Sequence, residues 1–161
     1  MTIVNALADQ IIGLQHVGHV VEDLDEAIRG FTRLYGLPDG AVRRYPEVFD
    51  GSEPTLFAFI TVGDTEFELI QPQSADAKAM LLASPRAGGG INHVAWRVRD
   101  IDACVRLLDE IGIRPGYVTP NGVVDTGRSK MVYLDPETTD GLLVELVERP
   151  EANQSLASDE D

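Results

Sequence analysis

The chain has 161 residues, of which 43% are hydrophobic and 25% are charged, and its formal net charge is −14. These proportions are typical of a soluble globular protein, and the acidic excess argues against nucleic acid or an anionic membrane as a partner, since both require a basic face. The sequence lacks an apolar run of about 18 residues that would span a membrane. It also lacks the basic flank of a secretory signal, so we expect a cytoplasmic protein.

Residues 14–72 show the pattern of one small module. Alternation at residues 14–21, which are rich in Val and His, predicts a strand. A helix follows, because Asp23 and Glu26 have the spacing of a capping box and apolar residues then recur at helical spacing up to Gly36. Three antiparallel strands are predicted after the helix, at residues 41–48, 56–62 and 65–71.

The same order returns at residues 91–148. A strand is predicted at 91–98 and a helix after Asp100, followed by strands at 114–118, 129–134 and 142–147. Between the two modules, residues 73–90 are typical of a linker helix and a hinge with three consecutive glycines. The C-terminal residues 149–161 are acidic and polar without periodicity, and we expect them to be disordered.

The two halves are related by a constant offset. His16 and His93 are 77 positions apart, and so are Glu68 and Glu145, which end two later apolar runs. A repeat of this length indicates a duplicated module, with two copies facing each other across a pseudo-twofold axis. The two histidines and two glutamates could then converge at that axis.

Two imidazoles and two carboxylates on one face are the ligand set of a divalent transition metal. Two glutamates would neutralise the ion and leave positions open for a pair of substrate oxygens. Any one of these residues alone is more simply a packed core histidine or a strand-edge glutamate. Four of them in one register, flanked by apolar residues that would leave a charge unpaired in the core, favour the metal site.

Five segments together resemble the vicinal oxygen chelate superfamily, and within it the methylmalonyl-CoA epimerases. They are HVG at 16–18, DLDEA at 23–27, VGDTEFEL at 62–69, HVAWRV at 93–98 and GLLVEL at 141–146. The resemblance covers residues 14–148. It implies an α+β fold in which two tandem βαβββ modules form a cupped mixed sheet around one divalent metal ion. The ligands that it implies are His16, His93 and Glu145, with Glu68 at a position where the family has Gln or Glu.

The implied activity is that of a metal-dependent epimerase or isomerase that removes a proton next to a metal-bound carbonyl, with acyl-CoA thioesters such as methylmalonyl-CoA as one substrate class. The carboxylates that could move the proton are Glu145, Glu68 and Glu47, the last because Pro46-Glu47 resembles a pair found in the epimerases. The ion would be Co, Mn, Ni, Zn or Fe, no organic cofactor is expected, and the superfamily commonly forms homodimers.

One departure from the epimerases concerns the substrate. Where they carry a basic His-Pro-Lys-Ser turn, this chain has acids in Asp135-Pro136-Glu137-Thr138. A CoA thioester of a dicarboxylate needs cations, so a neutral or smaller substrate is an alternative. The other cations available near the predicted strands are Arg43, Arg44, Arg97, Arg114, Arg128 and Lys130.

Other functions within the same superfamily remain open. They are a glyoxalase-like lyase, a non-haem iron dioxygenase and a metal-free small-molecule-binding protein of the same fold. Glu68 argues against the dioxygenase, whose iron normally has two His and one carboxylate, and the presence of all four ligand residues argues against the binding protein. His19 points away from His16 in a regular strand, so we expect it to be a packed or dimer-interface histidine.

Overall fold

The computed structural model describes residues 3–38, 40–82 and 90–150. A short helix, α1 (Ile3–Ala6), precedes the first module, and α3 (Ala75–Leu82) follows it. The elements of the first module are β1 (Ile11–Val20), α2 (Leu24–Tyr35), β2 (Val42–Tyr45), β3 (Thr55–Val62) and β4 (Thr65–Pro72). Those of the second module are β5 (Gly90–Val98), α4 (Ile101–Asp109), β6 (Val124–Asp125), β7 (Lys130–Tyr133), the 3-10 helix η1 (Pro136–Thr138) and β8 (Val144–Glu148).

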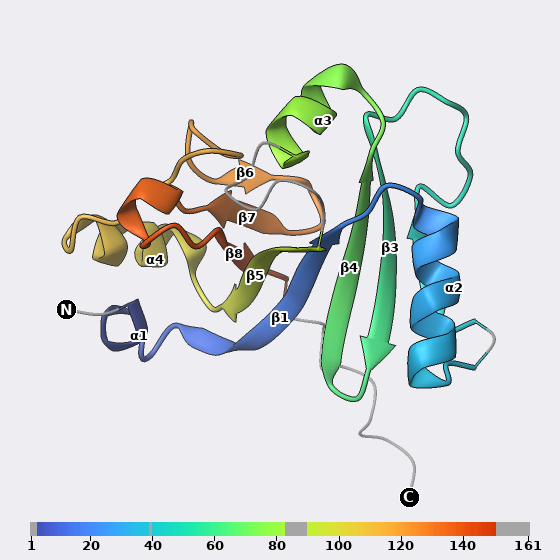
Figure 1. Ribbon diagram of the computed structural model, residues 1–161. Coiled ribbons are helices and arrows are strands. Elements are labelled where there is room, and N and C mark those ends of the chain that lie inside the picture. The colour runs from blue at the N-terminus through green and yellow to red at the C-terminus, as the bar shows by residue number, and fades with distance from the viewer. Residues whose placement is uncertain (1–2, 39, 83–89, 151–161) are drawn as a thin grey trace, which may run out of the picture.

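The strands form one curled eight-stranded sheet in the order β2-β3-β4-β1-β5-β8-β7-β6 (Figure 1). From the centre outwards the two modules have the same order, because β1 is followed by β4, β3 and β2 as β5 is followed by β8, β7 and β6. β1 pairs in parallel with β4, β5 pairs in parallel with β8, and β1 and β5 are antiparallel. This confirms the expected α+β fold of two βαβββ modules in one cupped mixed sheet.

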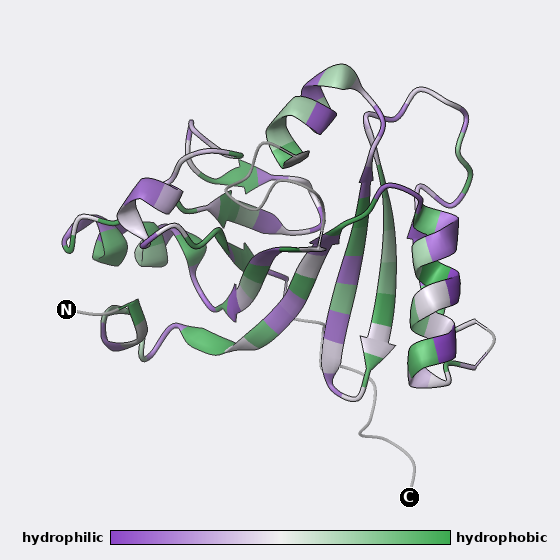
Figure 2. Cartoon of the chain, viewed as in Figure 1, coloured by the Kyte–Doolittle hydropathy of each residue, from purple (hydrophilic) through white to green (hydrophobic). Residues whose placement is uncertain are grey.

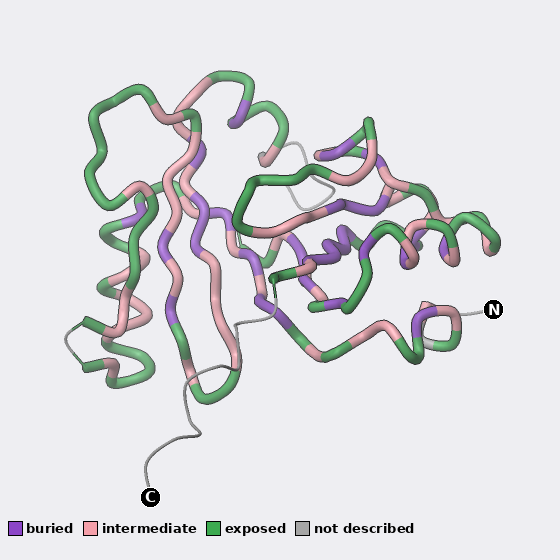
Figure 3. Tube along the Cα trace, turned by 180° about the vertical axis from the view of Figure 1, so that it is seen from behind, coloured by how far each residue is buried: buried purple, intermediate pink, exposed green. Residues whose placement is uncertain are grey.

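Each long helix covers one face of its own module. Leu24 of α2 packs with Ala58, Ile60 and Leu69 of β3 and β4, and α4 packs on the apolar side chains of β7 and β8. Figure 2 shows polar and apolar residues alternating along β4, as a strand with one apolar face requires. In Figure 3, many of the buried residues lie on the strands, whereas the long loop before β3 is largely exposed. We call the face of the sheet that is turned away from α2 and α4 the inner face.

The two helices begin with the same hydrogen bonds. Asp23 accepts from the backbone N–H of Glu26 at 2.7 Å, and Asp100 accepts from Ala103 at 2.8 Å, which confirms both predicted N-caps. A second bond comes from the last strand of each module. The N–H of Leu24 donates to Gln71 Oε1, and that of Ile101 donates to Glu148 Oε2, each at 2.8 Å. The start of each helix is therefore bonded to the sheet. The two donors are 77 positions apart in the sequence, and so are the two acceptors.

The predicted strand at 114–118 is wrong. Pro115 forms only an isolated bridge with Leu134, and Tyr117 has a φ of 56°. A proline without an N–H and a left-handed residue cannot continue a ladder. The short β6 forms instead, between the predicted strands at 114–118 and 129–134. The predicted strand at 41–48 likewise ends at Tyr45, just before Pro46.

The linker helix expected within residues 73–90 is observed as α3. Most of the glycine hinge, at 83–89, and the tail from 151 onwards lie outside the described residues. Within the part of the chain that the structure describes, no helix is long and apolar enough to cross a membrane.

We predict that Gln71→Ala lowers the free energy of unfolding by about 1 kcal/mol, because the N–H of Leu24 at the buried start of α2 loses its acceptor. Urea denaturation measures this change. Gln73→Ala is the matched control, since the hydrogen bond of Gln73 to Pro54 O is made by its backbone N–H, which the substitution keeps. Equal losses in both variants would contradict the capping role.

Candidate metal centre

The four predicted ligand residues lie on four neighbouring strands. His16 is on β1, Glu68 on β4, His93 on β5 and Glu145 on β8, which are the central strands of the sheet. In the register of these strands, Gly18 lies opposite both Glu68 and His93, and Ala95 lies opposite His16 and Glu145. Directly opposed residues project to the same face of a sheet. All four side chains therefore project from the inner face.

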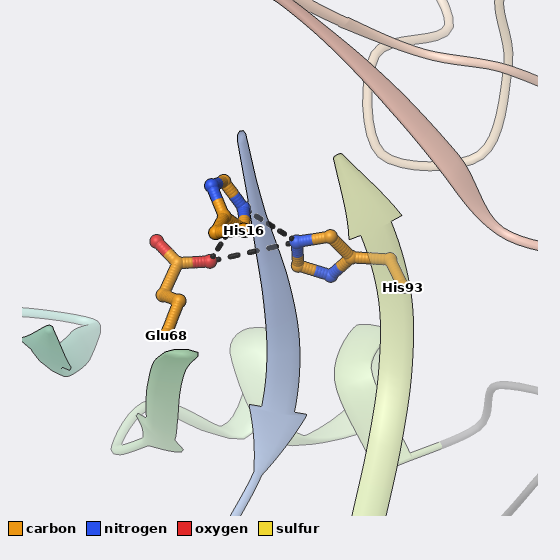
Figure 4. A group of neighbouring side chains, drawn as sticks. All are labelled: His16, Glu68 and His93. Atoms are coloured by element: carbon orange, nitrogen blue, oxygen red, sulfur yellow. Dashed lines mark hydrogen bonds and ion pairs between the residues drawn. The ribbon is translucent and has the colours of Figure 1, made fainter. Parts of the chain in front are cut away.

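The side chains converge on one point. His16 Nε2 and His93 Nε2 are 3.0 Å apart. Glu68 Oε2 lies 3.3 Å from the first of these nitrogens and 3.5 Å from the second. Glu145 Oε2 lies at 3.0 and 3.3 Å from the same two atoms. Figure 4 shows His16, Glu68 and His93 pointing toward one another from their separate strands.

The cluster is closed to solvent. The exposed fractions of the side chains are 7% for His16, 12% for Glu68, 1% for His93 and 4% for Glu145. Ionised groups at such depth are stable only when they are paired with opposite charge. Each carboxylate here faces two imidazoles, so the pairing comes from within the cluster.

The pKa values reflect this mutual pairing. Burial alone would lower the pKa of His16, but the hydrogen bonds to Glu145 and Glu68 and the charges of these carboxylates raise it to about 10. Burial would raise the pKa of Glu68, but His16 and His93 lower it to about 2. The same opposing causes raise the pKa of His93 and lower that of Glu145. At neutral pH both glutamates are therefore carboxylates.

The donor set fits a divalent metal ion. His16, Glu68 and His93 each offer one ligand atom, and these atoms lie within 4.8 Å of one another. Glu145 Oε2 is buried with them and lies 3.0 and 3.3 Å from the same two Nε2 atoms. Two nitrogens and two carboxylates facing one point match zinc and related ions in ligand type and number.

Sequence reasoning did not single out two residues that hold His93 in place. Asn92 Oδ1 lies 3.0 Å from His93 Nδ1 and fixes the far side of the ring. Tyr133, which lies opposite Glu145, has its ring edge-on to that of His93, with 5.2 Å between centroids. Burial, then the charges of Glu145 and Glu68, hold the pKa of the Tyr133 phenol well above its usual range. The inward alternation of β7 is the signal that could have identified Tyr133.

His19 lies on the opposite face of β1, as expected. Its ring packs edge-on against Phe31 of α2 and Phe67 of β4, with centroid distances of 5.7 and 5.9 Å. Burial and the charge of His93 lower its pKa. His19 is therefore a packed histidine beneath α2 and takes no part in the cluster.

Glu47 lies apart from the four ligand residues. It is exposed, and no hydrogen bond or ion pair joins it to the cluster among the described residues. It lines a cleft of about 230 Å³ together with Tyr45 and Phe57. In the register of β2 and β3 these two residues are directly opposed, and Phe57 shares the inner face with Phe59 and Glu68. The rings of Tyr45, Phe57 and Phe59 form a row on the inner face, which we call the aromatic row. The cleft lies at the end of this row at the edge of the sheet, because Leu24 and Leu56, which belong to the apolar core beneath α2, also line it.

Three arginines make ring or ion-pair contacts on the inner face. Arg43 stacks over Phe59 at 4.9 Å and donates to Glu66 Oε2 at 3.0 Å. Arg149, beyond the end of β8, lies 3.7 Å from Glu66 Oε1. Arg128 stacks over Tyr45 at 4.6 Å and so joins the second module to the first. A basic patch thus forms beside the cluster of a strongly acidic chain.

Comparison with known proteins identifies the family. The glyoxalase/bleomycin resistance protein/dioxygenase superfamily matches residues 15–133. The chain belongs to this superfamily. An ethylmalonyl-CoA/methylmalonyl-CoA epimerase of Cereibacter sphaeroides is 30% identical to it over 135 residues, which cover 83% of this chain and 95% of the epimerase. The mitochondrial methylmalonyl-CoA epimerase of Bos taurus is 27% identical over 133 residues, which cover 83% of this chain and 72% of that protein.

Solved structures of the superfamily share the fold. The crystal structure of methylmalonyl-CoA epimerase from Mycobacterium tuberculosis superposes with a TM-score of 0.65 at 29% identity and covers 87% of this chain and 89% of that one. A methylmalonyl-CoA epimerase in complex with methylmalonyl-CoA and NH4+ has a TM-score of 0.69 at 21% identity, over 88% and 96% of the two chains. The predicted resemblance to this superfamily and to its epimerases is thereby confirmed.

We predict that His93→Ala lowers the affinity for Co²⁺ or Zn²⁺ by more than about 100-fold, which exceeds the usual effect of a supporting residue. The circular dichroism spectrum should change little, because the substitution leaves the apolar cores beneath α2 and α4 untouched. Isothermal titration calorimetry measures the affinity. His19→Ala is the control, since it removes an imidazole from the opposite face of the sheet. Wild-type affinity in His93→Ala would contradict the ligand assignment.

The metal-free protein should lose stability as the pH rises. The pKa of His16 is raised from 6.5 to about 10, so its contribution is complete below about pH 6.5 and is lost toward pH 10. The pKa of Glu68 is lowered from 4.5 to about 2, so its contribution is complete above about pH 4.5 and is lost toward pH 2. Urea midpoints in the presence of a chelator should therefore be highest between about pH 4.5 and about pH 6.5, where both contributions are complete. A midpoint that does not change between pH 6.5 and 9.5 would show that the cluster is not coupled in this way.

Proposed function

We propose that the protein is a divalent-metal-dependent epimerase that removes and returns the proton on the carbon next to the carbonyl of an acyl-CoA thioester such as methylmalonyl-CoA. The observation that carries the proposal is the convergence of His16, Glu68, His93 and Glu145 on one buried point. The epimerase relatives support the reaction class.

The four converging side chains would hold the ion, which we expect to be Co, Mn, Ni, Zn or Fe. When bound, such an ion supplies Lewis acidity toward a carbonyl oxygen. The two carboxylates balance its charge, so that no net charge is buried. Asn92 and Tyr133 restrain His93 and keep its Nε2 directed at the common point.

Glu47 is our choice for the carboxylate that moves the proton. A general base works best when its pKa lies near the working pH. Glu68 is a poor base on this criterion, because its pKa is lowered to about 2, and the pKa of Glu145 is lowered as well. Glu47 is exposed and lines the cleft at the end of the aromatic row.

The arginines of the inner face support an anionic substrate in spite of the acidic chain. Arg43 and Arg149 share a single carboxylate, Glu66, so one positive charge remains in excess there. Arg128 adds a second at the opposite end of the aromatic row. An acyl-CoA thioester presents both phosphates and, in methylmalonyl-CoA, a carboxylate, and guanidinium groups bind either one.

The test is proton exchange in deuterated buffer. Methylmalonyl-CoA incubated with the metal-loaded protein should lose its α-proton signal in the NMR spectrum far faster than in buffer alone. We predict that Glu47→Gln lowers this rate at least about 100-fold, within the range that general bases contribute, while the affinity for Co²⁺ stays unchanged. Glu110→Gln, an exposed change at the end of α4, is the control. Absence of exchange with the wild-type protein would refute the epimerase, and substrate-dependent oxygen uptake would point to an oxygenase instead.

A further inference from the structure

Gly18 lies where the ring of His93 leaves no room for a side chain. The two residues are directly opposed on β1 and β5. A Cβ atom built on Gly18 would lie 2.1 Å from Cε1, 2.5 Å from Nδ1 and 2.6 Å from Nε2 of His93. Ordinary contacts of a Cβ atom begin at 3.4 Å. The imidazole therefore occupies the space in which every other residue would place its first side-chain carbon.

The backbone does not explain the glycine. Gly18 is absent from the residues with positive φ in the described chain, and it pairs with both neighbouring strands, directly before a shift in the β1–β5 register. Any L-residue could adopt this conformation. A glycine in the interior of a strand is normally a cost, since it adds chain entropy and packs no side chain. What requires it here is the close approach of the His93 ring.

The pseudo-twofold symmetry of the two modules is not exact at this position. Ala95 lies 77 positions after Gly18 and faces His16 as Gly18 faces His93. It carries a Cβ and is fully buried. The ring of His16 thus leaves space for a methyl group, whereas that of His93 does not. The two imidazoles of the duplicated site are held differently, although they occupy equivalent positions in the sequence.

His93 cannot move aside to admit a side chain at position 18. Its side chain is 1% exposed, Asn92 contacts its Nδ1, and the ring of Tyr133 lies against it. To restore an ordinary contact, the ring would have to move from 2.1 Å to 3.4 Å. A catalytic or metal site tolerates displacements of only about 0.5 Å.

We propose that Gly18 is a positioning residue: the absence of its side chain allows His93 to reach the common point of the cluster. The proposal rests on the proposed metal site for its functional meaning, and on the contact between β1 and β5 for its structural basis.

Metal affinity gives the first test. Gly18→Ala should bind Co²⁺ at least about 10-fold more weakly than the wild-type protein in calorimetric titrations, as expected when the support of a ligand is lost. Gly13→Ala is the matched control on the same strand, because a Cβ there meets no atom within 4 Å. Ala95→Gly, the reciprocal change at the equivalent position, should retain the metal. Wild-type affinity in Gly18→Ala would overturn the proposal.

A double-mutant cycle in the metal-free protein gives the second test. Gly18→Ala should lower the urea midpoint strongly when His93 is present and much less in the His93→Ala background, because the smaller residue makes room for the methyl group. Recovery of a folded protein in the double variant counts as the same result if Gly18→Ala alone does not fold. Equal losses in both backgrounds, or two unfolded variants, would overturn the proposal. If the wild-type protein binds no metal, the proposed function fails, but this cycle still tests the contact.

Discussion

The antiparallel pairing of β1 with β5 is the constraint on which the whole site depends. It joins two modules into one sheet and places His16 beside Ala95 and Gly18 beside His93. The parallel pairing of β4 with β1 and of β8 with β5 then adds one glutamate from each side. A shift of this register by one residue would turn each histidine to the other face of the sheet. The cluster therefore exists only because His16 pairs with Ala95 and Gly18 pairs with His93 along this stretch of the β1–β5 ladder.

Burying four ionisable side chains is costly, and the arrangement offsets the cost internally. Each histidine faces both carboxylates, and each carboxylate faces both histidines, at 3.0 to 3.5 Å. A buried charge without such a partner would be strongly destabilising. In the metal-free protein, protons on the imidazoles balance the negative charges of the carboxylates. A divalent ion would replace these protons when it binds, since metal ligands bind in their deprotonated forms. The same charges thus stabilise the fold and prepare the site.

The two faces of the sheet have separate tasks. On the outer face, Leu69 and Ile60 pack beneath α2, and even the polar His19 serves only in packing there. The residues that precede Leu69 and Ile60 in the sequence, Glu68 and Phe59, project to the inner face. There Glu68 belongs to the cluster, and Phe59 lies opposite Glu68 and beneath the stacked Arg43. Strand alternation makes this possible, because adjacent residues point to opposite sides. Stability and chemistry are thereby carried by alternate positions of the same strands.

The offset of 77 residues, the capped helices and the alternation of the strands were enough to predict two equivalent modules and the convergence of His16, Glu68, His93 and Glu145, because a repeat and a periodicity are visible in the sequence itself. The closure of both modules into one cupped sheet was implied by the resemblance to the superfamily. Elements whose form depends on long-range pairing were not predictable in this way, as the failed strand around Pro115 and the observed β6 show. Only the tertiary structure revealed that Tyr133 lies against His93, that Arg149 lies near Glu66 and that Gly18 must lack a side chain. These are contacts between strands distant in sequence, and a repeat that makes Gly18 and Ala95 equivalent in sequence cannot show that only one of them lies under an imidazole ring.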